Sequence, residues 1–476
     1  MQADTIVAIA TAPGSAGVGV IRLSGPRAVD AVARVFRPAD GRVLPLQPAR
    51  HLAFGRLVDG QGSLLDEALV VRFAAPASFT GEDVVEIQAH GGTYILRSIQ
   101  DALLERGRDL LPPLRLARPG EFTQRAFLNG KLDLTQAEAV ADLIHSGSSL
   151  AREAAARQLA GSLQGVVEGL CQGVLGLLAE AEAACDFPEE AGQLAGRAAW
   201  VTTVSALRGR MGGLLGTAHT GRMLTQGVRV CLAGAPNAGK SSLLNALAGE
   251  ERAIVSPEPG TTRDWLELRY QVQGMPVLLY DTAGLREAQG AVEAEGVRRT
   301  RRWAAEADLL LLLLDQTAPF EPAWLDLLRE VATPALLVLT KSDLDPVWDS
   351  GALRGALKPR RPEWMGDGLS RRMLSVSAKQ GSGLEALQSA ILDTALGGRA
   401  AQAMESVLLT QARHEAAMRA AFEALGLVEA SLAAGGGPEL LAVDLRSALD
   451  SLGEIVGLTT RAEVLEQIFA RFCIGK

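Results

Sequence analysis

The order of apolar and polar residues divides the chain into strand-rich and helix-rich stretches. Short apolar runs rich in β-branched residues, which are typical of strands, occupy residues 5–10, 18–23 and 83–88. Over residues 120–222 the apolar residues instead recur at helical spacing, in a composition dominated by Ala, Leu, Glu and Gln. We therefore predict an α+β segment over residues 1–119, followed by several long helices.

Strand-like runs return in the middle of the chain. They are short and almost wholly apolar, as expected for strands buried on both faces of a parallel sheet, and lie at residues 228–233, 277–280, 309–314, 336–339 and 373–376. We predict an α/β domain over residues 223–396. Residues 397–476 return to a helical composition, which Gly-Gly-Gly-Pro at 435–438 breaks into two arms. The same composition on both sides predicts one helical domain into which the α/β domain is inserted.

The link between the first of these strands and the helix after it has the composition of a phosphate-binding loop. Residues 234–241 are Gly-Ala-Pro-Asn-Ala-Gly-Lys-Ser, and they follow an apolar strand and precede a helix-forming run. Glycines let backbone N–H groups approach phosphate oxygens, and the helix N-terminus favours the negative charge. We expect Lys240 to reach the β- and γ-phosphates of a nucleotide and the Ser241 hydroxyl to bind Mg²⁺.

Four further loops follow in the order that a GTPase requires. Thr262, in the first, offers a second hydroxyl to Mg²⁺, and Asp281, which opens the second, would hold Mg²⁺ through water. Asp343, in the third, can accept hydrogen bonds from the ring N–H and the amine of guanine, which adenine does not offer. The predicted GTP-binding residues are Asn237, Ala238, Gly239, Lys240, Ser241, Ser242, Ser256, Thr261, Thr262, Asp281, Thr282, Ala283, Gly284, Thr340, Lys341, Asp343, Ser377, Ala378 and Lys379.

Composition narrows the class of protein further. The 476 residues carry a net charge of −8 and only 4% aromatic residues, which argues against a chain that grips nucleic acid by bulk charge or base stacking. We interpret the basic runs at 298–302 and 358–361 as solvated faces. The four cysteines show no metal-ligand spacing, and the first residues lack the basic and apolar parts of a signal peptide. The apolar run at 309–314 is too short to cross a bilayer, so we expect a cytoplasmic protein without membrane attachment.

Several motifs, taken together and in order, resemble one family over the full length of the chain. They are Gly-Val-Gly-Val-Ile-Arg at 17–22, Ser-Phe-Thr-Gly-Glu-Asp at 78–83, Arg-Pro-Gly-Glu-Phe-Thr at 118–123, Arg-Ala-Phe-Leu-Asn at 125–129, Lys-Leu-Asp-Leu at 131–134, Asp-Thr-Ala-Gly-Leu-Arg-Glu at 281–287 and Phe-Cys-Ile-Gly-Lys at 472–476. In this set the chain resembles the tRNA uridine-modification GTPases called MnmE or TrmE. The resemblance implies a folate-binding and dimerisation domain at 1–119, a helical domain in two parts at 120–222 and 397–476, and an inserted P-loop GTPase domain at 223–396.

The resemblance also implies how GTP is hydrolysed. Leu285 stands where many GTPases carry a Gln that orients the attacking water. Glu293 matches the catalytic Glu of the family, which would act together with Lys240 and Asn237. A potassium ion would take the place of an arginine finger and offset charge between the phosphates. The K⁺ ligands that the resemblance implies are Asn237, Ser256, Glu258 and Thr261.

For the N-terminal domain the resemblance implies a one-carbon donor, a formyl- or methylene-tetrahydrofolate. The positions that match the folate contacts of the family are Arg22, Glu86, Lys131 and Lys476. The family forms homodimers and acts with an FAD-containing partner, and the pair installs an aminomethyl-type group at carbon 5 of the wobble uridine, position 34, of certain tRNAs. This chain shows no flavin-binding fingerprint, so we expect the FAD on the partner.

Some residues depart from the family pattern, and two other functions stay open. Thr340 replaces the usual Asn of the guanine motif, while Pro257 and Pro259 fall in the loop that would supply carbonyl ligands to K⁺. The affinities for GTP and K⁺ are therefore left open, as is the role of Cys473. A regulatory GTPase switch, for example in ribosome assembly, would bind no folate. A folate-dependent transferase with a structural nucleotide domain would keep modifying tRNA after Lys240→Ala.

Overall fold

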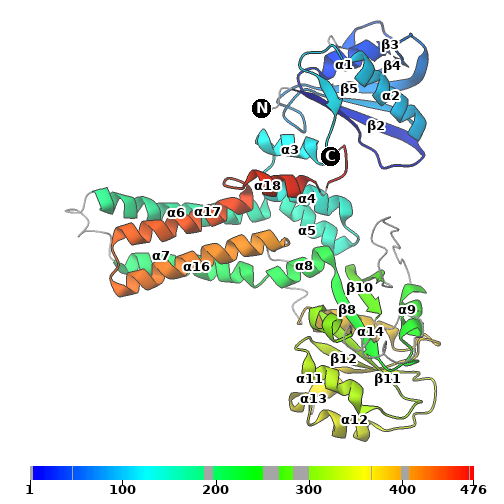
Figure 1. The fold of residues 1–476 in the computed structure, drawn as a ribbon, viewed down its shortest axis with the longest axis vertical. Coiled ribbons are helices and arrows are strands. Elements are labelled where there is room, and N and C mark those ends of the chain that lie inside the picture. The colour runs from blue at the N-terminus through cyan, green and yellow to red at the C-terminus, as the bar shows by residue number, and fades with distance from the viewer. Residues whose placement is uncertain are drawn as a thin grey trace. The chain divides into compact units, whose positions relative to one another are not determined.

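The computed structural model describes residues 4–44, 47–186, 197–249, 267–281, 300–365, 367–397, 407–470 and 472–475. The chain forms two compact units, which are coloured along the sequence in Figure 1. The first unit comprises Met1–Ala141, Gln158–Glu182 and Leu445–Lys476, and the second comprises Asp142–Arg157 and Ala183–Asp444. Each unit therefore draws on segments that lie far apart in the sequence.

The first unit contains a seven-stranded sheet in the order β3-β4-β5-β6-β2-β1-β7. Its strands are β1 (Thr5–Ile9), β2 (Ala16–Ser24), β3 (Phe36–Pro38), β4 (Ala53–Val58), β5 (Leu64–Phe73), β6 (Val84–Gly91) and β7 (Leu114–Leu116). All neighbours pair antiparallel except β1 and β7, which are parallel. Helices α1 (Ala28–Val35) and α2 (Thr93–Arg106) join the strands in one core that contains Ile21, Ile87 and Ile99. The strands predicted at 5–10, 18–23 and 83–88 are confirmed as β1, β2 and β6.

Besides α1 and α2, five described helices lie wholly or mostly in the first unit. They are α3 (Glu121–Leu128), α4 (Leu134–His145), α6 (Ser162–Asp186), α17 (Pro438–Val456) and α18 (Ala462–Phe469). The buried residues of α6 recur every three or four positions and include Leu163, Val167, Leu170, Val174, Leu177 and Ala181. Among the described residues α6 is the one helix that is long and apolar enough to cross a membrane. Its buried stripe agrees with one of the long helices predicted over residues 120–222, and an exposed ion pair of Glu182 with Arg446 at 2.6 Å joins it to α17.

The second unit contains a six-stranded sheet in the order β13-β12-β11-β8-β10-β9. Its strands are β8 (Val228–Gly234), β9 (Glu267–Val272), β10 (Met275–Asp281), β11 (Leu309–Asp315), β12 (Ala335–Thr340) and β13 (Met373–Val376). All pairs are parallel except β9 with β10. The five strands predicted from apolar runs are thus confirmed, and the antiparallel edge strand β9 is added to them.

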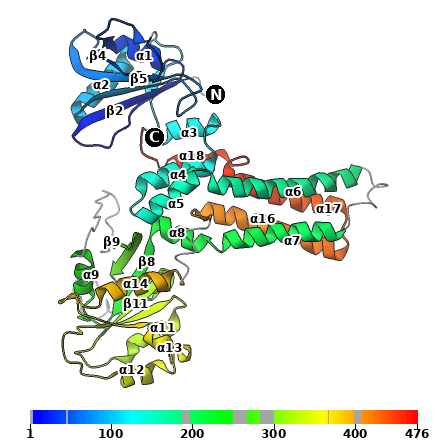
Figure 2. The same ribbon diagram turned by 180° about the vertical axis from the view of Figure 1, so that it is seen from behind.

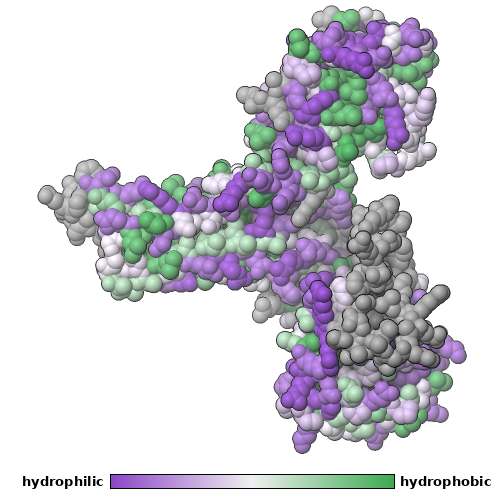
Figure 3. Space-filling view, in the orientation of Figure 1, coloured by the Kyte–Doolittle hydropathy of each residue, from purple (hydrophilic) through white to green (hydrophobic). Residues whose placement is uncertain are grey.

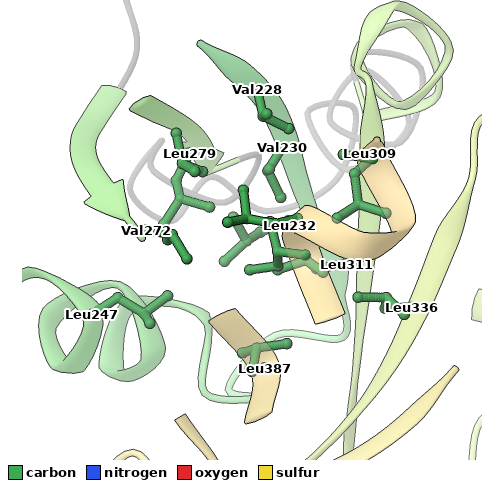
Figure 4. Packing of buried hydrophobic residues seen from close by; sticks show 14 of the residues in the cluster. Val228, Val230, Leu232, Leu247, Val272, Leu279, Leu309, Leu311, Leu336 and Leu387 are labelled. Carbon is green, nitrogen blue, oxygen red and sulfur yellow. The ribbon is translucent and has the colours of Figure 1, made fainter. Parts of the chain in front are cut away.

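Both faces of this sheet are covered. On one face Val230, Leu232 and Leu311 pack with Leu247 of α9 (Lys240–Gly249) and Leu387 of α14 (Leu384–Ala395), as Figure 4 shows. The opposite face packs under α11 (Asp326–Glu330) and α12 (Ser350–Leu357). Two-sided burial explains the uninterrupted apolar run of β11, whose residues from Leu309 to Leu314 are all buried.

The second unit also contains helices from both sides of the sheet domain in the sequence. They are α5 (Ser149–Leu159), α7 (Arg197–Leu215), α8 (Ala218–Gln226) and α16 (Ala412–Ala434). Helices α7 and α16 lie side by side in Figures 1 and 2, and Arg208 forms an ion pair with Glu429 between them. Gly435, at a left-handed φ of 84°, ends α16 before α17 begins at Pro438, which confirms the predicted break into two arms.

Candidate nucleotide-binding site

The loop between β8 and α9 has the backbone that a phosphate-binding loop requires. Gly234 has a φ of 145°, and a Cβ at that position would lie 2.4 Å from the carbonyl oxygen of Leu313, so a larger residue is excluded. Gly239 (φ 89°) and Asn237 (φ 63°) are also left-handed, and Asn tolerates this region better than most residues. The chain can therefore turn tightly from the strand into the first turn of the helix.

Lys240 lies at the centre of this loop. Its side chain is buried, and its Nζ donates to the carbonyl oxygens of Gly234 and Ala235, both at 2.8 Å. These contacts hold the ammonium group inside the curve of the loop, where it can exchange carbonyl oxygens for phosphate oxygens. Ser241 and Ser242 follow in the first turn of α9, and both are exposed.

Thr340, at the end of β12, connects the predicted guanine loop to the phosphate loop. Its buried hydroxyl donates to the carbonyl oxygen of Ala238 at 2.8 Å, with the carbonyl oxygen of Leu314 at 3.3 Å as a second acceptor. The two residues joined by the shorter bond are 102 positions apart in the sequence. The threonine that replaces the usual Asn thus makes a bond that holds one nucleotide loop against another.

The loop after β12 presents a carboxylate. Lys341 (φ 58°) forms an ion pair with Asp315 of β11 at 2.5 Å. Burial alone would raise the pKa of Asp315, but the hydrogen bonds from Lys341 and Thr317 outweigh burial and lower this pKa. The hydroxyl of Ser377 donates to Asp343 Oδ1 at 2.6 Å and is the main cause of the lowered pKa of Asp343. Asp343 is therefore charged, and the hydrogen bond from Ser377 orients its side chain. Lys379, which is exposed, adds a smaller electrostatic contribution in the same direction.

The strand order brings these loops to one edge of the sheet. Parallel strands β8, β11, β12 and β13 all end there, and ligands of open α/β sheets bind outside these carboxyl ends. The backbone of Asp281 pairs with Leu232 in β8, so β10 ends at the same edge. The predicted site residues outside the described part of the chain are Ser256, Glu258, Thr261, Thr262, Thr282, Ala283, Gly284, Glu293 and Lys476.

The first unit brings together a second group of predicted residues. Arg22 and Glu86 are register partners in β2 and β6, and their side chains form an ion pair at 2.8 Å. The Arg22 guanidinium lies 5.9 Å from the ring centre of Phe79 and 5.8 Å from that of Phe122, within reach of cation–π attraction. It also lies 3.4 Å from the carbonyl oxygen of Gly475 in the C-terminal tail. Charged, aromatic and backbone groups from four segments therefore converge on Arg22.

Lys131 lies beside the loop before β6, not in direct contact with Arg22. Its Nζ donates to the carbonyl oxygen of Pro76 at 3.1 Å, while Asn129 donates to the carbonyl oxygen of Thr80 at 2.7 Å. Both contacts fall on the segment that carries Phe79. Lys131 thus holds the same loop that borders Arg22.

A buried charge cluster, which the sequence analysis did not single out, fixes α3 to this sheet. Arg125 forms ion pairs with Asp4 at 2.9 Å, with Glu82 at 3.0 Å and with Glu121 at 3.2 Å, and its side chain is only 3% exposed. Arg115 forms ion pairs with Glu121 at 2.5 Å and with Asp4 at 2.6 Å. We call these five residues the Arg125 cluster. Three of them, Glu82, Glu121 and Arg125, lie in motifs that carry the family resemblance, and this was the one available signal.

Glu121 is the fully buried member of the Arg125 cluster. Burial alone would raise the pKa of its carboxyl group, but hydrogen bonds from Arg115, the backbone N–H of Arg118 and Arg125 lower the pKa to about 2. The same contacts raise the pKa of the Arg115 guanidinium. The charges of Arg115 and Glu121 therefore stabilise each other in their ionised forms.

A phosphate-binding loop, a guanine-type Thr-Lys-Ser-Asp loop and a Ser-Ala-Lys loop at one edge of a parallel sheet define a P-loop GTPase of multidomain architecture. The family model for the MnmE helical domain matches residues 134–473, and the model for the N-terminus of the GTP-binding protein TrmE matches residues 5–131. The chain is 44% identical to the tRNA modification GTPase MnmE of Syntrophotalea carbinolica over 99% of both chains, and 42% identical to that of Symbiobacterium thermophilum over 100% of both. The chain belongs to the MnmE family of tRNA modification GTPases, and it is a GTP hydrolase of that family.

Some solved structures match parts of the chain. The G domain of the T. maritima FeoB iron transporter is 27% identical, covers 35% of this chain and 98% of its own, and has a TM-score of 0.24. Aquifex aeolicus Era is 24% identical, covers 42% of this chain and 67% of its own, and has a TM-score of 0.27. The family assignment rests on the full-length relatives and not on these partial likenesses.

Proposed function

We propose that this chain is a K⁺-dependent GTP hydrolase that acts on tRNA. Together with an FAD-containing partner it uses a tetrahydrofolate one-carbon unit to install an aminomethyl-type group at carbon 5 of the wobble uridine. The observation that supports the proposal is the presence, in one member of the MnmE family, of the described phosphate and guanine loops and of the group around Arg22. As a tRNA-modifying enzyme it would act in the cytoplasm.

The phosphate loop would bind the nucleotide with Mg²⁺. Lys240 would leave its two carbonyl partners for the β- and γ-phosphates, because an ammonium group gains more from a charged acceptor than from a neutral one. The exposed hydroxyl of Ser241 fits Mg²⁺ by its place directly after Lys240, and Thr262 would supply the second hydroxyl. Bound Mg²⁺ neutralises charge on the β- and γ-phosphates.

The K⁺ site would lie against Asn237. Its left-handed backbone turns the loop at this residue, and an amide oxygen suits a hard cation. The remaining proposed ligands, Ser256, Glu258 and Thr261, lie outside the described residues, as does Glu293, which would orient the attacking water. Bound K⁺ offsets phosphate charge in place of an arginine finger.

The test of this site is the GTP hydrolysis rate in K⁺ and in Na⁺ at equal ionic strength. We expect strong stimulation by K⁺ that is lost in Asn237→Ala and in Glu293→Ala. The matched control is Asn245→Ala, an exposed asparagine on α9, which should keep the stimulation. Equal slow rates of the unmodified chain in both salts would refute K⁺ dependence.

The group around Arg22 would bind the tetrahydrofolate. Arg22 offers a cation to folate carboxylates, Glu86 accepts hydrogen bonds from a pterin edge, and the rings of Phe79 and Phe122 lie beside the Arg22 guanidinium. Lys131 and Lys476 would add positive charge, and Lys476 directly follows the tail residue that contacts Arg22. Bound tetrahydrofolate supplies the one-carbon unit.

Calorimetric titration with 5-formyl-tetrahydrofolate tests this site without any enzyme assay. Arg22→Gln should abolish the binding heat. Arg56→Gln is a matched control, because Arg56 also pairs with a glutamate, Glu67, on a neighbouring strand but is exposed. An unmodified chain that binds no folate would refute this site and favour the regulatory GTPase switch.

The domain division stays a proposal as well. We infer that residues 120–222 and 397–476 form one helical domain with the nucleotide domain, 223–396, inserted between them. Ion pairs between these two segments support it, namely Arg208 with Glu429 and Arg222 with Glu415. Limited proteolysis near Gly221 and Gly398 that released no compact nucleotide-binding fragment would contradict the inference. We propose a homodimer, which light scattering of the purified chain would test.

A further inference from the structure

One face of the nucleotide-binding unit is strongly basic, although the chain is acidic. Residues 354–372 contain six basic and two acidic residues, whereas the whole chain has a net charge of −8. This stretch includes the end of α12, the short helix η4 (Pro362–Trp364) and α13 (Asp367–Ser370), and it ends directly before β13. Figure 3 shows hydrophilic residues over the part of this unit where Figure 1 labels α12 and α13. We call the following six residues the basic face: Arg354, Lys358, Arg360, Arg361, Arg371 and Arg372.

One end of the basic face, at Arg372, lies at the edge of the sheet opposite the nucleotide loops. Arg372 directly precedes β13, and its carbonyl oxygen accepts a hydrogen bond from Leu337 near the start of β12. The loops that carry Thr340 and Ser377 follow the carboxyl ends of the same two strands. GTP bound at those loops would therefore not contact the basic face.

Buried contacts hold part of the basic face in place. Trp364 is only 5% exposed, and its ring centre lies 5.6 Å from the guanidinium of Arg361 and 5.2 Å from that of Arg372. Arg361 also donates to a backbone carbonyl oxygen at 2.9 Å, and Arg360 pairs with Asp326 at 2.8 Å. Cations fixed in this way lose little side-chain freedom when they bind a ligand.

Most of the basic face keeps its charge uncompensated. Arg360 and Arg361 have carboxylate partners, the latter in an exposed pair with Glu363 at 3.3 Å. The basic residues of this face with no carboxylate partner among the described residues are Arg354, Lys358, Arg371 and Arg372. The aromatic ring of Trp364 is buried and so offers no surface for stacking bases. The cations of the basic face therefore suit binding to a chain of phosphates.

We propose that the basic face binds the phosphate backbone of the tRNA on which this family acts. The contact would be independent of base sequence, because cations that meet phosphates carry affinity and position but do not distinguish bases. It would also place RNA on the GTPase unit without covering the nucleotide loops. The proposal rests on the role of the family in tRNA modification and needs neither the K⁺ site nor the folate site.

The test uses the full chain and fluorescently labelled tRNA, with anisotropy measured from 50 to 200 mM KCl. The variant carries Arg354→Gln, Lys358→Gln and Arg371→Gln together, and it spares the arginines that pack on Trp364. We expect the affinity at 100 mM salt to fall about tenfold or more, and the slope of log affinity against log salt to become shallower by about two to three, for three lost phosphate contacts.

A triple variant at exposed arginines elsewhere is the charge-matched control. It carries Arg97→Gln, Arg152→Gln and Arg210→Gln, which are exposed, and it should bind tRNA like the unmodified chain. GTP hydrolysis and 5-formyl-tetrahydrofolate binding should be unchanged in both variants. A failure of the proposed nucleotide or folate site would therefore be seen in these two measurements and not in tRNA binding.

Three outcomes would overturn the proposal. The first is an equal loss of tRNA affinity in both variants, which would indicate a non-specific effect of net charge. The second is an unmodified chain that binds no tRNA at 50 mM salt. The third is unchanged tRNA binding together with lost binding of the FAD-containing partner, which would make the basic face a protein-docking surface.

Discussion

Replacing Glu121 by Gln removes the charge at the centre of the Arg125 cluster. The carboxylate accepts hydrogen bonds from Arg115 at 2.5 Å, from Arg125 at 3.2 Å and from the backbone N–H of Arg118 at 2.8 Å, with no exposed surface of its own. A carboxyl pKa of about 2, against an ordinary value of 4.5, corresponds to about 3 kcal/mol of stability at neutral pH. Breaking one partner of a buried ion pair costs a similar amount, about 3 to 5 kcal/mol.

The pH dependence of stability gives the prediction a second readout. Because the pKa of Glu121 is lower in the folded chain than in the unfolded chain, its contribution is complete above pH 4.5 and is lost as the pH falls towards 2. Unmodified chain should therefore lose stability over this interval. Glu121→Gln should lose about 3 kcal/mol at pH 7 and should show a shallower decline between pH 4.5 and 2, because one titrating group is gone.

Hydrogen exchange of the β1 and α3 amides in urea is the suitable assay, since a chain of two units need not unfold in one step. Glu67→Gln is the matched control. Glu67 pairs with Arg56 at 3.4 Å on an exposed strand face, and such pairs contribute about 1 kcal/mol or less. A loss below about 1 kcal/mol in Glu121→Gln, with the unmodified pH profile, would refute the reasoning about the Arg125 cluster.

Three further substitutions probe other contacts. Thr340→Val keeps the shape of the side chain but loses the hydroxyl hydrogen bond to the phosphate loop, so the affinity for GDP and GTP should fall about five- to tenfold. Thr340→Ser should retain the affinity. Equal affinities of the Thr340→Val variant and the unmodified chain would contradict a role of this hydrogen bond in nucleotide binding. Ser377→Ala should weaken GTP binding several-fold, measured by fluorescent-nucleotide titration. Its effect should be the same at pH 6 and pH 8, because the pKa of Asp343 then rises only towards its ordinary value of 3.8. Gly120→Ala should lower the free energy of unfolding by about 1 to 3 kcal/mol and the thermal midpoint with it. The reason is that φ of Gly120 is +66° and that a Cβ there would lie 2.5 Å from a carbonyl oxygen at the end of α18. An unchanged thermal midpoint would show that the backbone relaxes at this position.

The sequence predicted the elements whose signals are local. Apolar runs identified the strands at 228–233, 309–314 and 336–339, because strands buried on both faces leave no room for polar residues. The order of loops after those strands indicated a GTPase site, because parallel strands bring their carboxyl ends to one edge.

The sequence analysis did not predict strand β5, because charged residues interrupt its apolar run. It carries Asp66 and Glu67 among apolar residues, and its inner and outer positions do not alternate regularly. Its place in the sheet depends on pairing with β4 and β6. Local periodicity contains no information about such partners.

By itself, then, the sequence determined the strands and helices with regular burial, the phosphate loop and the family resemblance. Only the tertiary structure decided that Arg22 meets Glu86 across 64 positions, that Thr340 meets Ala238 across 102, and that Arg125 joins Asp4 and Glu82 from two other segments. The physical reason is that periodicity and backbone preference act over a few residues, whereas ion pairs and hydrogen bonds between distant segments depend on how the chain packs.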